Sequence, residues 1–219
     1  MQRPTRLASP KTLGAVLLVA LLVAMVLNTK FVTPKELASL GPQSFDPEQT
    51  AAELFEEAGT EFGDRAAPLA EVVTAIQTDP EAAAEKYEAA KPNAGTLVFA
   101  VNATGTVTEA SAGSLQLKVD GVPEETRVLV PVTTAINGTV LRDALGFKFA
   151  DAPGQSDFQF VGDELKKLMQ AAVTDGVGDP TALKGKQITV LGVVSVVGSG
   201  PAPKAKPVNI QPVKVQVGA

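Results

Sequence analysis

The sequence contains no cysteine, no histidine and no tryptophan among its 219 residues. Their absence excludes disulfides, thiolate nucleophiles, imidazole bases, zinc sites built from cysteine and histidine, and lipid attachment to a cysteine. Aromatic residues make up only 5% of the chain. The hydrophobic fraction of 45% is ordinary for globular domains, so the chain as a whole is not disordered.

Charge is unevenly distributed along the chain. The net charge is -5, yet residues 1–30 hold four basic side chains and no acidic one, which leaves residues 31–219 with a net charge of -9. A body this acidic repels phosphate backbones. We therefore expect no nucleic-acid partner.

Residues 12–29 form a long uncharged run, TLGAVLLVALLVAMVLNT. As a helix, this run reaches about 27 Å, close to the roughly 30 Å of a hydrocarbon core. Basic residues precede it, which places the N-terminus in the cytoplasm. The sequence thus predicts a single-pass transmembrane helix through residues 12–29, with the C-terminal domain extracytoplasmic. A cleaved signal peptide is the competing interpretation, and the lack of an A-x-A site favours the anchor.

Residues 31–95 are predicted to form a linker and a small helical segment. Thr33-Pro34-Lys35-Glu36 matches a capping box, and Asp46-Pro47 and Asp79-Pro80 repeat the helix-start signal. Apolar residues at helical spacing follow Asp46 and Pro68, and an Ala-rich segment follows Asp79. Pro92-Asn93-Ala94-Gly95 ends the helical pattern.

Residues 96–219 are predicted to form a β domain, which makes the fold class α+β. The extended segments are rich in β-branched residues or, as at residues 115–119, alternate in hydrophobicity, and their order is three strands, a helix and two strands. This is the order of an OB-like five-stranded antiparallel β-barrel with one helix between strands three and four. Gly192 inside a long strand predicts a bend or bulge, and Pro212 an edge or bulge. An open antiparallel sheet carrying one helix is the alternative.

Searches for catalytic motifs give no match. Gly185-Lys186 lacks the first glycine and the Ser/Thr of a phosphate loop, and Gly176-Val177-Gly178 follows a helix instead of a strand. Carboxylates remain the general acid/base groups, with Asp143, Asp151, Asp157, Asp163 and Glu164 close in sequence. No spacing rule selects a pair among them, so we predict no catalytic residue, no cofactor site and no metal site.

One cluster of aromatic and charged residues stands out. It comprises Arg142, Asp143, Phe147, Phe149, Phe158 and Phe160. Aromatic rings beside a cation and an acceptor are what a sugar or carboxylate site uses. Alternatively, Arg142 pins this connection to the barrel while the phenylalanines close its end. The second, structural interpretation is favoured because no further motif indicates a ligand.

Several of these segments resemble an uncharacterised family of predicted periplasmic lipoproteins, a domain of unknown function. The resemblance covers most of residues 30–218. It is carried by the apolar run followed by Thr29-Lys30, Phe45-Asp46-Pro47, Gly138-Thr139-Val140-Leu141-Arg142-Asp143-Ala144-Leu145, Phe147-x-Phe149, Leu183-x-Gly185-Lys186 and Gln211-Pro212-Val213. It implies an extracytoplasmic protein whose gene often lies beside sugar ABC-transporter genes. Family members carry a cysteine after the apolar run, and this chain has none, so the resemblance implies anchorage by the polypeptide alone.

The sequence therefore predicts a membrane-anchored, non-enzymatic extracytoplasmic protein. Its predicted parts are an anchor (1–30), a linker with a helical segment (31–95) and an OB-like domain (96–219). The first functional hypothesis is an accessory or binding protein linked to sugar uptake by an ABC transporter. The alternatives are a structural envelope scaffold without a small ligand, and a carboxylate-based glycan hydrolase.

Overall fold

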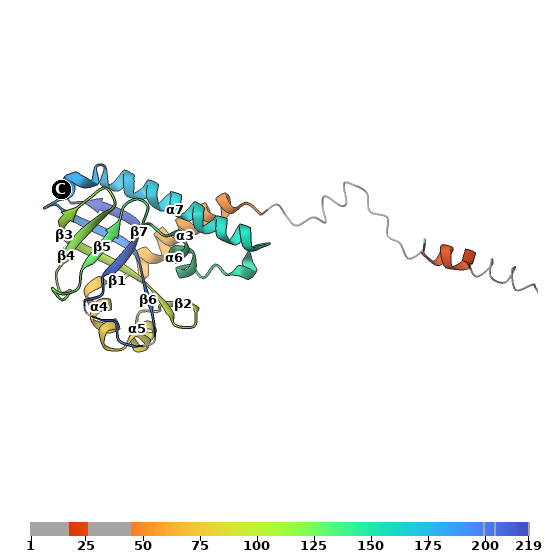
Figure 1. Cartoon of the computed structure of the whole chain (residues 1–219), viewed down its shortest axis with the longest axis horizontal. Coiled ribbons are helices and arrows are strands. Elements are labelled where there is room, and N and C mark those ends of the chain that lie inside the picture. The colour runs from red at the N-terminus through yellow and green to blue at the C-terminus, as the bar shows by residue number, and fades with distance from the viewer. Residues whose placement is uncertain (1–17, 26–44, 199, 204, 219) are drawn as a thin grey trace, which may run out of the picture. The chain divides into compact units, whose positions relative to one another are not determined.

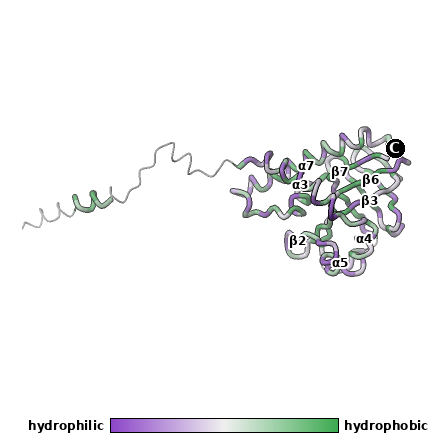
Figure 2. The backbone as a smooth tube through the Cα atoms, turned by 180° about the vertical axis from the view of Figure 1, so that it is seen from behind, coloured by the Kyte–Doolittle hydropathy of each residue, from purple (hydrophilic) through white to green (hydrophobic). Residues whose placement is uncertain are grey.

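The structure, a computed structural model, describes residues 18–25, 45–198, 200–203 and 205–218 (Figure 1). The chain divides into two units, Met1–Ser44 and Phe45–Ala219. In the first unit, residues 18–25 form a hydrophobic stretch of helix, green in Figure 2, with exposed side chains. The predicted capping box at residues 33–36 lies outside the described residues.

The predicted transmembrane helix over residues 12–29 is not supported. In the described part of the chain, no helix has the length and apolarity needed to cross a membrane. Residues 18–25 of that run are helical, and the remainder lies outside the described residues. The predicted single-pass topology is likewise not supported in the described part of the chain.

The second unit begins with helices that start at the predicted aspartate caps. In helix α3 (Pro47–Arg65), Asp46 accepts from the amides of Glu48 and Gln49 at 3.0 and 3.2 Å. Asp79 caps α5 (Pro80–Lys86) in the same way. Helix α4 (Leu69–Thr78) precedes α5 and buries one apolar face. These caps confirm the helix starts predicted from the Asp-Pro pairs.

A seven-stranded sheet forms the centre of this unit. Its strands are β1 (Ala67–Pro68), β2 (Ala90–Asn93), β3 (Thr96–Ala110), β4 (Ser114–Val119), β5 (Val128–Pro131), β6 (Gln187–Val197) and β7 (Val208–Val217). The pairing path runs β1-β3-β4-β5-β7-β6, β6 pairs in turn with β3, and β2 pairs with β3. Strand β3 is continuously buried from Leu97 to Val101 and alternates buried and exposed residues after that, whereas β6 alternates except at residues 192–194.

The prediction of a five-stranded antiparallel barrel is wrong in strand number and direction. The sheet has seven strands, and β1 pairs with β3, and β5 with β7, in parallel. The extra strands β1 and β2 come from the helical segment. Both are short and contain proline, so they show no alternating pattern by which the sequence would reveal them.

More than one helix lies between β5 and β6. The elements there are α6 (Gly138–Ala144), the 3-10 turn η1 (Phe149–Asp151), α7 (Gln155–Val177) and the 3-10 turn η2 (Pro180–Leu183). Helix α7 begins eight residues before Asp163, the predicted cap. Figure 1 shows α7 and α3 lying side by side along the sheet, and α6 packs against α7.

The helices and the strands of the second unit share one hydrophobic core. Phe62 of α3 and Val72 of α4 are buried in the same cluster as Phe99, Ile188 and Ile210 of the strands. The register of β6 and β7 shifts between Leu191 and Gly192, opposite Pro212, which confirms the predicted bulge. Glycine is required at position 192, since a Cβ there would meet the carbonyl oxygen of Gln211.

Candidate functional site

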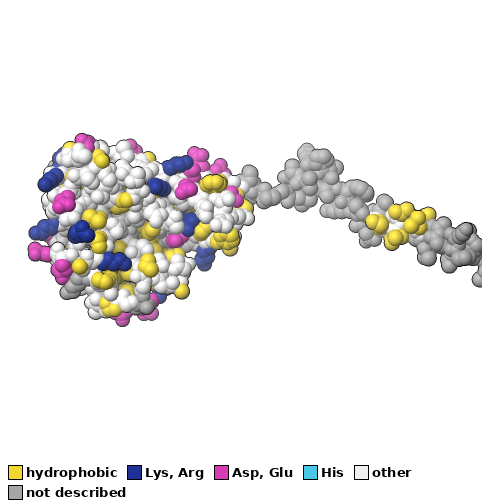
Figure 3. All heavy atoms as spheres, in the orientation of Figure 1, with side chains coloured by type: hydrophobic (Ala, Val, Ile, Leu, Met, Phe, Trp, Pro, Cys, Tyr) yellow, Lys and Arg dark blue, Asp and Glu magenta, His cyan; other side chains and the backbone are white. Residues whose placement is uncertain are grey.

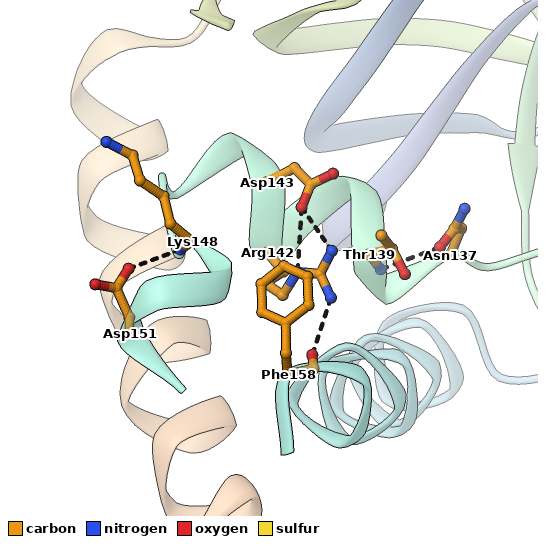
Figure 4. A network of polar contacts seen from close by, with 7 residues as sticks. All are labelled: Asn137, Thr139, Arg142, Asp143, Lys148, Asp151 and Phe158. Atoms are coloured by element: carbon orange, nitrogen blue, oxygen red, sulfur yellow. Dashed lines mark hydrogen bonds and ion pairs between the residues drawn. The ribbon is translucent and has the colours of Figure 1, made fainter. Parts of the chain in front are cut away.

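The sequence-predicted cluster lies on α6, the connection from α6 to η1, η1 itself and the first two turns of α7. Asn137 caps α6 by accepting from the amide of Thr139 at 3.0 Å, and this places Arg142 in the last turn. A carboxylate oxygen of Asp151 accepts from the amide of Lys148 at 2.7 Å and so fixes the start of η1. Figure 4 shows these contacts around Arg142.

Arg142 is almost fully buried, at 6% exposure, and connects two helices. Its Nε and Nη2 donate to Oδ1 of Asp143 at 3.1 and 2.8 Å. Its Nη1 donates to the carbonyl oxygen of Phe158 at 2.9 Å, and the guanidinium carbon lies 3.5 Å from the centre of the Phe158 ring (Figure 4). Arginine suits this position because its planar fork can donate in several directions and stack at the same time.

Four phenylalanine rings contact one another in a row. Phe45 stacks on Phe147 with centroids 6.5 Å apart, and Phe147 stacks on Phe158 at 6.0 Å. Phe149 meets Phe158 edge-on at 5.7 Å. Phe45 was missed by the sequence reasoning because it stands about 100 residues before its partner.

Phe160 does not join this row. It is 52% exposed and lies outside the groove that the other predicted residues line. Residues two positions apart on a helix point in nearly opposite directions, which separates Phe160 from Phe158. The structure therefore brings together five of the six predicted residues and leaves Phe160 apart.

A groove of about 540 Å³ runs between β2 and the α6–η1 segment. Its lining is formed by Ala90, Lys91, Pro92, Asn93, Arg142, Asp143, Gly146, Phe147, Lys148, Phe149 and Phe158. The volume is typical of small-molecule sites, and aromatic rings with a few polar groups are their usual lining. In the sequence, Ala90–Asn93 read only as the end of the helical segment.

The carboxylates near the cluster do not form a catalytic pair in this groove. Asp143 is the one acidic side chain in its lining, and Oδ1 of Asp143 is held by Arg142. Asp151 caps η1, and Glu164 pairs with Lys167 at 2.7 Å, which raises the pKa of Lys167. No group of three or more candidate metal-ligating side chains occurs among the residues that the structure describes.

A second hollow lies between α4 and α5, with a volume of about 600 Å³. Alanine and threonine side chains form most of its surface. At one end, Tyr87 donates to Glu71 at 3.2 Å and accepts from Lys86 at 2.9 Å. The bond to Tyr87 raises the pKa of Lys86. This hollow lacks the aromatic row of the groove.

Comparison with solved structures identifies a similar fold. An OB-fold protein from Thermotoga maritima matches with a TM-score of 0.64 and 17% sequence identity, over 80% of this chain and 100% of that chain. At this identity the similarity shows the fold alone, and it supports the OB-like part of the fold prediction. No curated protein matches the chain.

Comparison with protein families gives a match over residues 16–216, to the family described as predicted periplasmic lipoprotein, DUF2291. The match covers the second unit up to residue 216, within β7, and includes every residue that lines the groove. The chain lacks the cysteine that a lipid attachment to that residue type requires. By the extent of this match, the chain belongs to the DUF2291 family of predicted periplasmic lipoproteins.

Proposed function

We propose that this chain is a non-enzymatic extracytoplasmic binding or accessory protein whose ligand surface is the groove between β2 and the α6–η1 segment. The observation that carries the proposal is the groove itself. The groove places β2 opposite Arg142, Asp143 and Phe149, although about 50 residues separate β2 from them in the chain.

Sugars are the ligand class that this lining suits. Phe149 is 58% exposed and offers a ring face, and Asn93 and Lys148 add polar groups at the same groove. A flat apolar face surrounded by a few donors and acceptors is the usual composition of a small-molecule site. The family resemblance adds an accessory role in sugar uptake by an ABC transporter.

A thermal-shift screen of the purified full chain against sugars tests this function. A ligand at 100 times its Kd should stabilise the chain by about 2.7 kcal/mol. Phe149→Ala should weaken binding of a hit about tenfold, because it removes the exposed ring. Val197→Ala is the matched control, since Val197 is 68% exposed and lies outside the groove lining. If no sugar shifts the melting temperature, or if both variants weaken binding equally, the proposal is wrong.

A structural envelope scaffold is the second candidate. It is favoured by one observation, namely that the Nε, Nη1 and Nη2 atoms of Arg142 all donate within the protein. In a scaffold, the cluster serves only to hold α6 against α7. Replacement of Arg142 would then lower stability, and no small molecule would shift the melting temperature.

The proposal also includes a membrane contact through residues 12–29. Its support is the set of apolar side chains at 18–25, of which Leu18, Leu21 and Met25 are each about 60% exposed (yellow in Figure 3). Double replacement Leu21→Asp and Leu22→Asp should release the chain from vesicles into the supernatant after centrifugation. The control replaces Val197 and Phe160 with aspartate and should leave sedimentation unchanged. If the Leu21/Leu22 variant still sediments with vesicles, this contact is excluded.

A further inference from the structure

The groove carries a charge opposite in sign to that of the chain. Three basic side chains and one acidic side chain line it, a net of +2, whereas the chain has a net charge of -5. The hollow between α4 and α5 has two acidic side chains and one basic side chain in its lining, a net of -1. The groove and the hollow between α4 and α5 therefore carry net charges of opposite sign.

The charges of Arg142 and Asp143 compensate each other inside the protein. Arg142 and Asp143 form an ion pair at 2.8 Å with only 7% and 23% of their side chains exposed. A buried pair of this geometry stays together, because separating it would leave an uncompensated charge. The remaining basic side chains of the groove are Lys91 and Lys148.

Lys148 has an ammonium group available to a ligand. Among the described residues, its side chain is in no ion pair, and the bond to Asp151 uses its backbone amide. Figure 4 shows the ammonium group pointing away from the Asp151 carboxylate. Lys148 directly precedes Phe149 in the chain, and the ring of Phe149 is exposed. Both residues belong to the lining of the groove.

Lys91 contributes the second charge from the opposite wall, on β2. It pairs with Glu81 at 3.0 Å, and both side chains are about half exposed. Exposed pairs of this kind contribute little stability, so an incoming anion can compete for the lysine. Glu81 does not line the groove.

We infer that the groove takes a saccharide bearing an anionic group, a carboxylate or a phosphate, in preference to a neutral one. The anion accepts from Lys91 and Lys148, and the ring of the sugar lies on Phe149. This inference rests on the proposed sugar-binding function and assigns its ligand class. Charge-assisted hydrogen bonds are about twice as strong as neutral ones, which makes the anion the main source of selectivity.

Calorimetry on the full chain tests this selectivity with two matched pairs of probes, galacturonate against galactose and glucose 6-phosphate against glucose. In at least one pair, the anionic member should bind about tenfold more tightly. Raising the salt concentration from 0.01 to 1 M should remove most of this difference, because the Debye length shrinks from about 30 Å to about 3 Å. Preference for galacturonate over galactose indicates a carboxylate ligand, and preference for glucose 6-phosphate over glucose indicates a phosphate ligand.

The double variant Lys91→Gln/Lys148→Gln should bind the anionic and the neutral sugar equally. Lys184→Gln/Lys214→Gln removes the same charge at exposed positions outside the groove and should keep the preference. If the wild-type chain binds neutral and anionic members equally, this inference is overturned and the sugar-binding proposal stands. If none of the four probes binds, the sugar-binding proposal fails together with it.

Discussion

Arg142 makes two contacts with Phe158: its guanidinium group stacks on the ring and also donates a hydrogen bond to the carbonyl oxygen. The guanidinium carbon lies 3.5 Å from the ring centre, and Nη1 donates to the Phe158 carbonyl oxygen at 2.9 Å. Because Arg142 belongs to α6 and Phe158 to the first turn of α7, one side chain fixes the orientation of both helices. The groove wall depends on that orientation, since Phe147 and Phe149 lie in the connection between them.

Arg142→Ala should destabilise the fold by about 1–3 kcal/mol. The substitution leaves Asp143 and the Phe158 carbonyl oxygen without their donor at a nearly buried site. Urea unfolding followed by circular dichroism measures the change. Phe160→Ala is the control and should change stability little, because that ring is 52% exposed. An unchanged midpoint for Arg142→Ala would contradict a structural role for the guanidinium.

Gly138→Ala should also destabilise the protein, by about 1–3 kcal/mol, because α6 and α7 approach too closely for a side chain. A Cβ at position 138 would meet the Gly162 carbonyl oxygen and lie 2.5 Å from the Lys166 amide nitrogen. Gly63→Ala in α3 is the matched control, since nothing lies within 4 Å of its Cβ position. That change should be neutral or stabilise the helix by up to about 1 kcal/mol. Equal melting temperatures for the two variants would exclude this packing argument.

A fragment of residues 96–219 should unfold at lower urea than a fragment of residues 45–219. The shorter fragment lacks Phe62, Leu69 and Val72, each at most 1% exposed and part of the common core. Their loss exposes apolar surface of the strands to water, which lowers the free energy of unfolding by about 25 cal/mol for each Å² exposed. Circular dichroism at increasing urea provides the two midpoints. Coincident midpoints would show that the helical segment contributes nothing to the stability of the sheet.

Asp179 should titrate below its ordinary pKa of 3.8. The hydroxyl and the amide of Thr181 both donate to its carboxylate, at 2.7 and 2.9 Å, and so favour the charged form. Stability from this cap is complete above pH 3.8 and disappears as the pH falls through the lowered pKa. Carbon-detected NMR titration should show the pKa of Asp179 rising in Thr181→Val. An unshifted value in that variant would exclude the hydroxyl as a cause.

Local features of the fold could be predicted from the sequence. Asp46 and Asp79 cap helices because a carboxylate followed by proline satisfies the first amides whatever the rest of the chain does. Residues 187–197 are predicted to form one long strand, and the glycine within it marks the bulge. These features depend on residues within a few positions of one another, so a single sequence contains the whole signal.

Tertiary structure alone decided the pairings that make the groove. The Ala90–Asn93 strand forms because β3 offers it a hydrogen-bonding edge, and nothing in its own four residues requires an extended conformation. Likewise, Phe45 meets Phe147, and Arg142 selects the Phe158 carbonyl oxygen, only once α3, α6 and α7 pack on one sheet. Contacts between residues far apart in the chain depend on the free energy of the entire core, and no local pattern encodes that quantity.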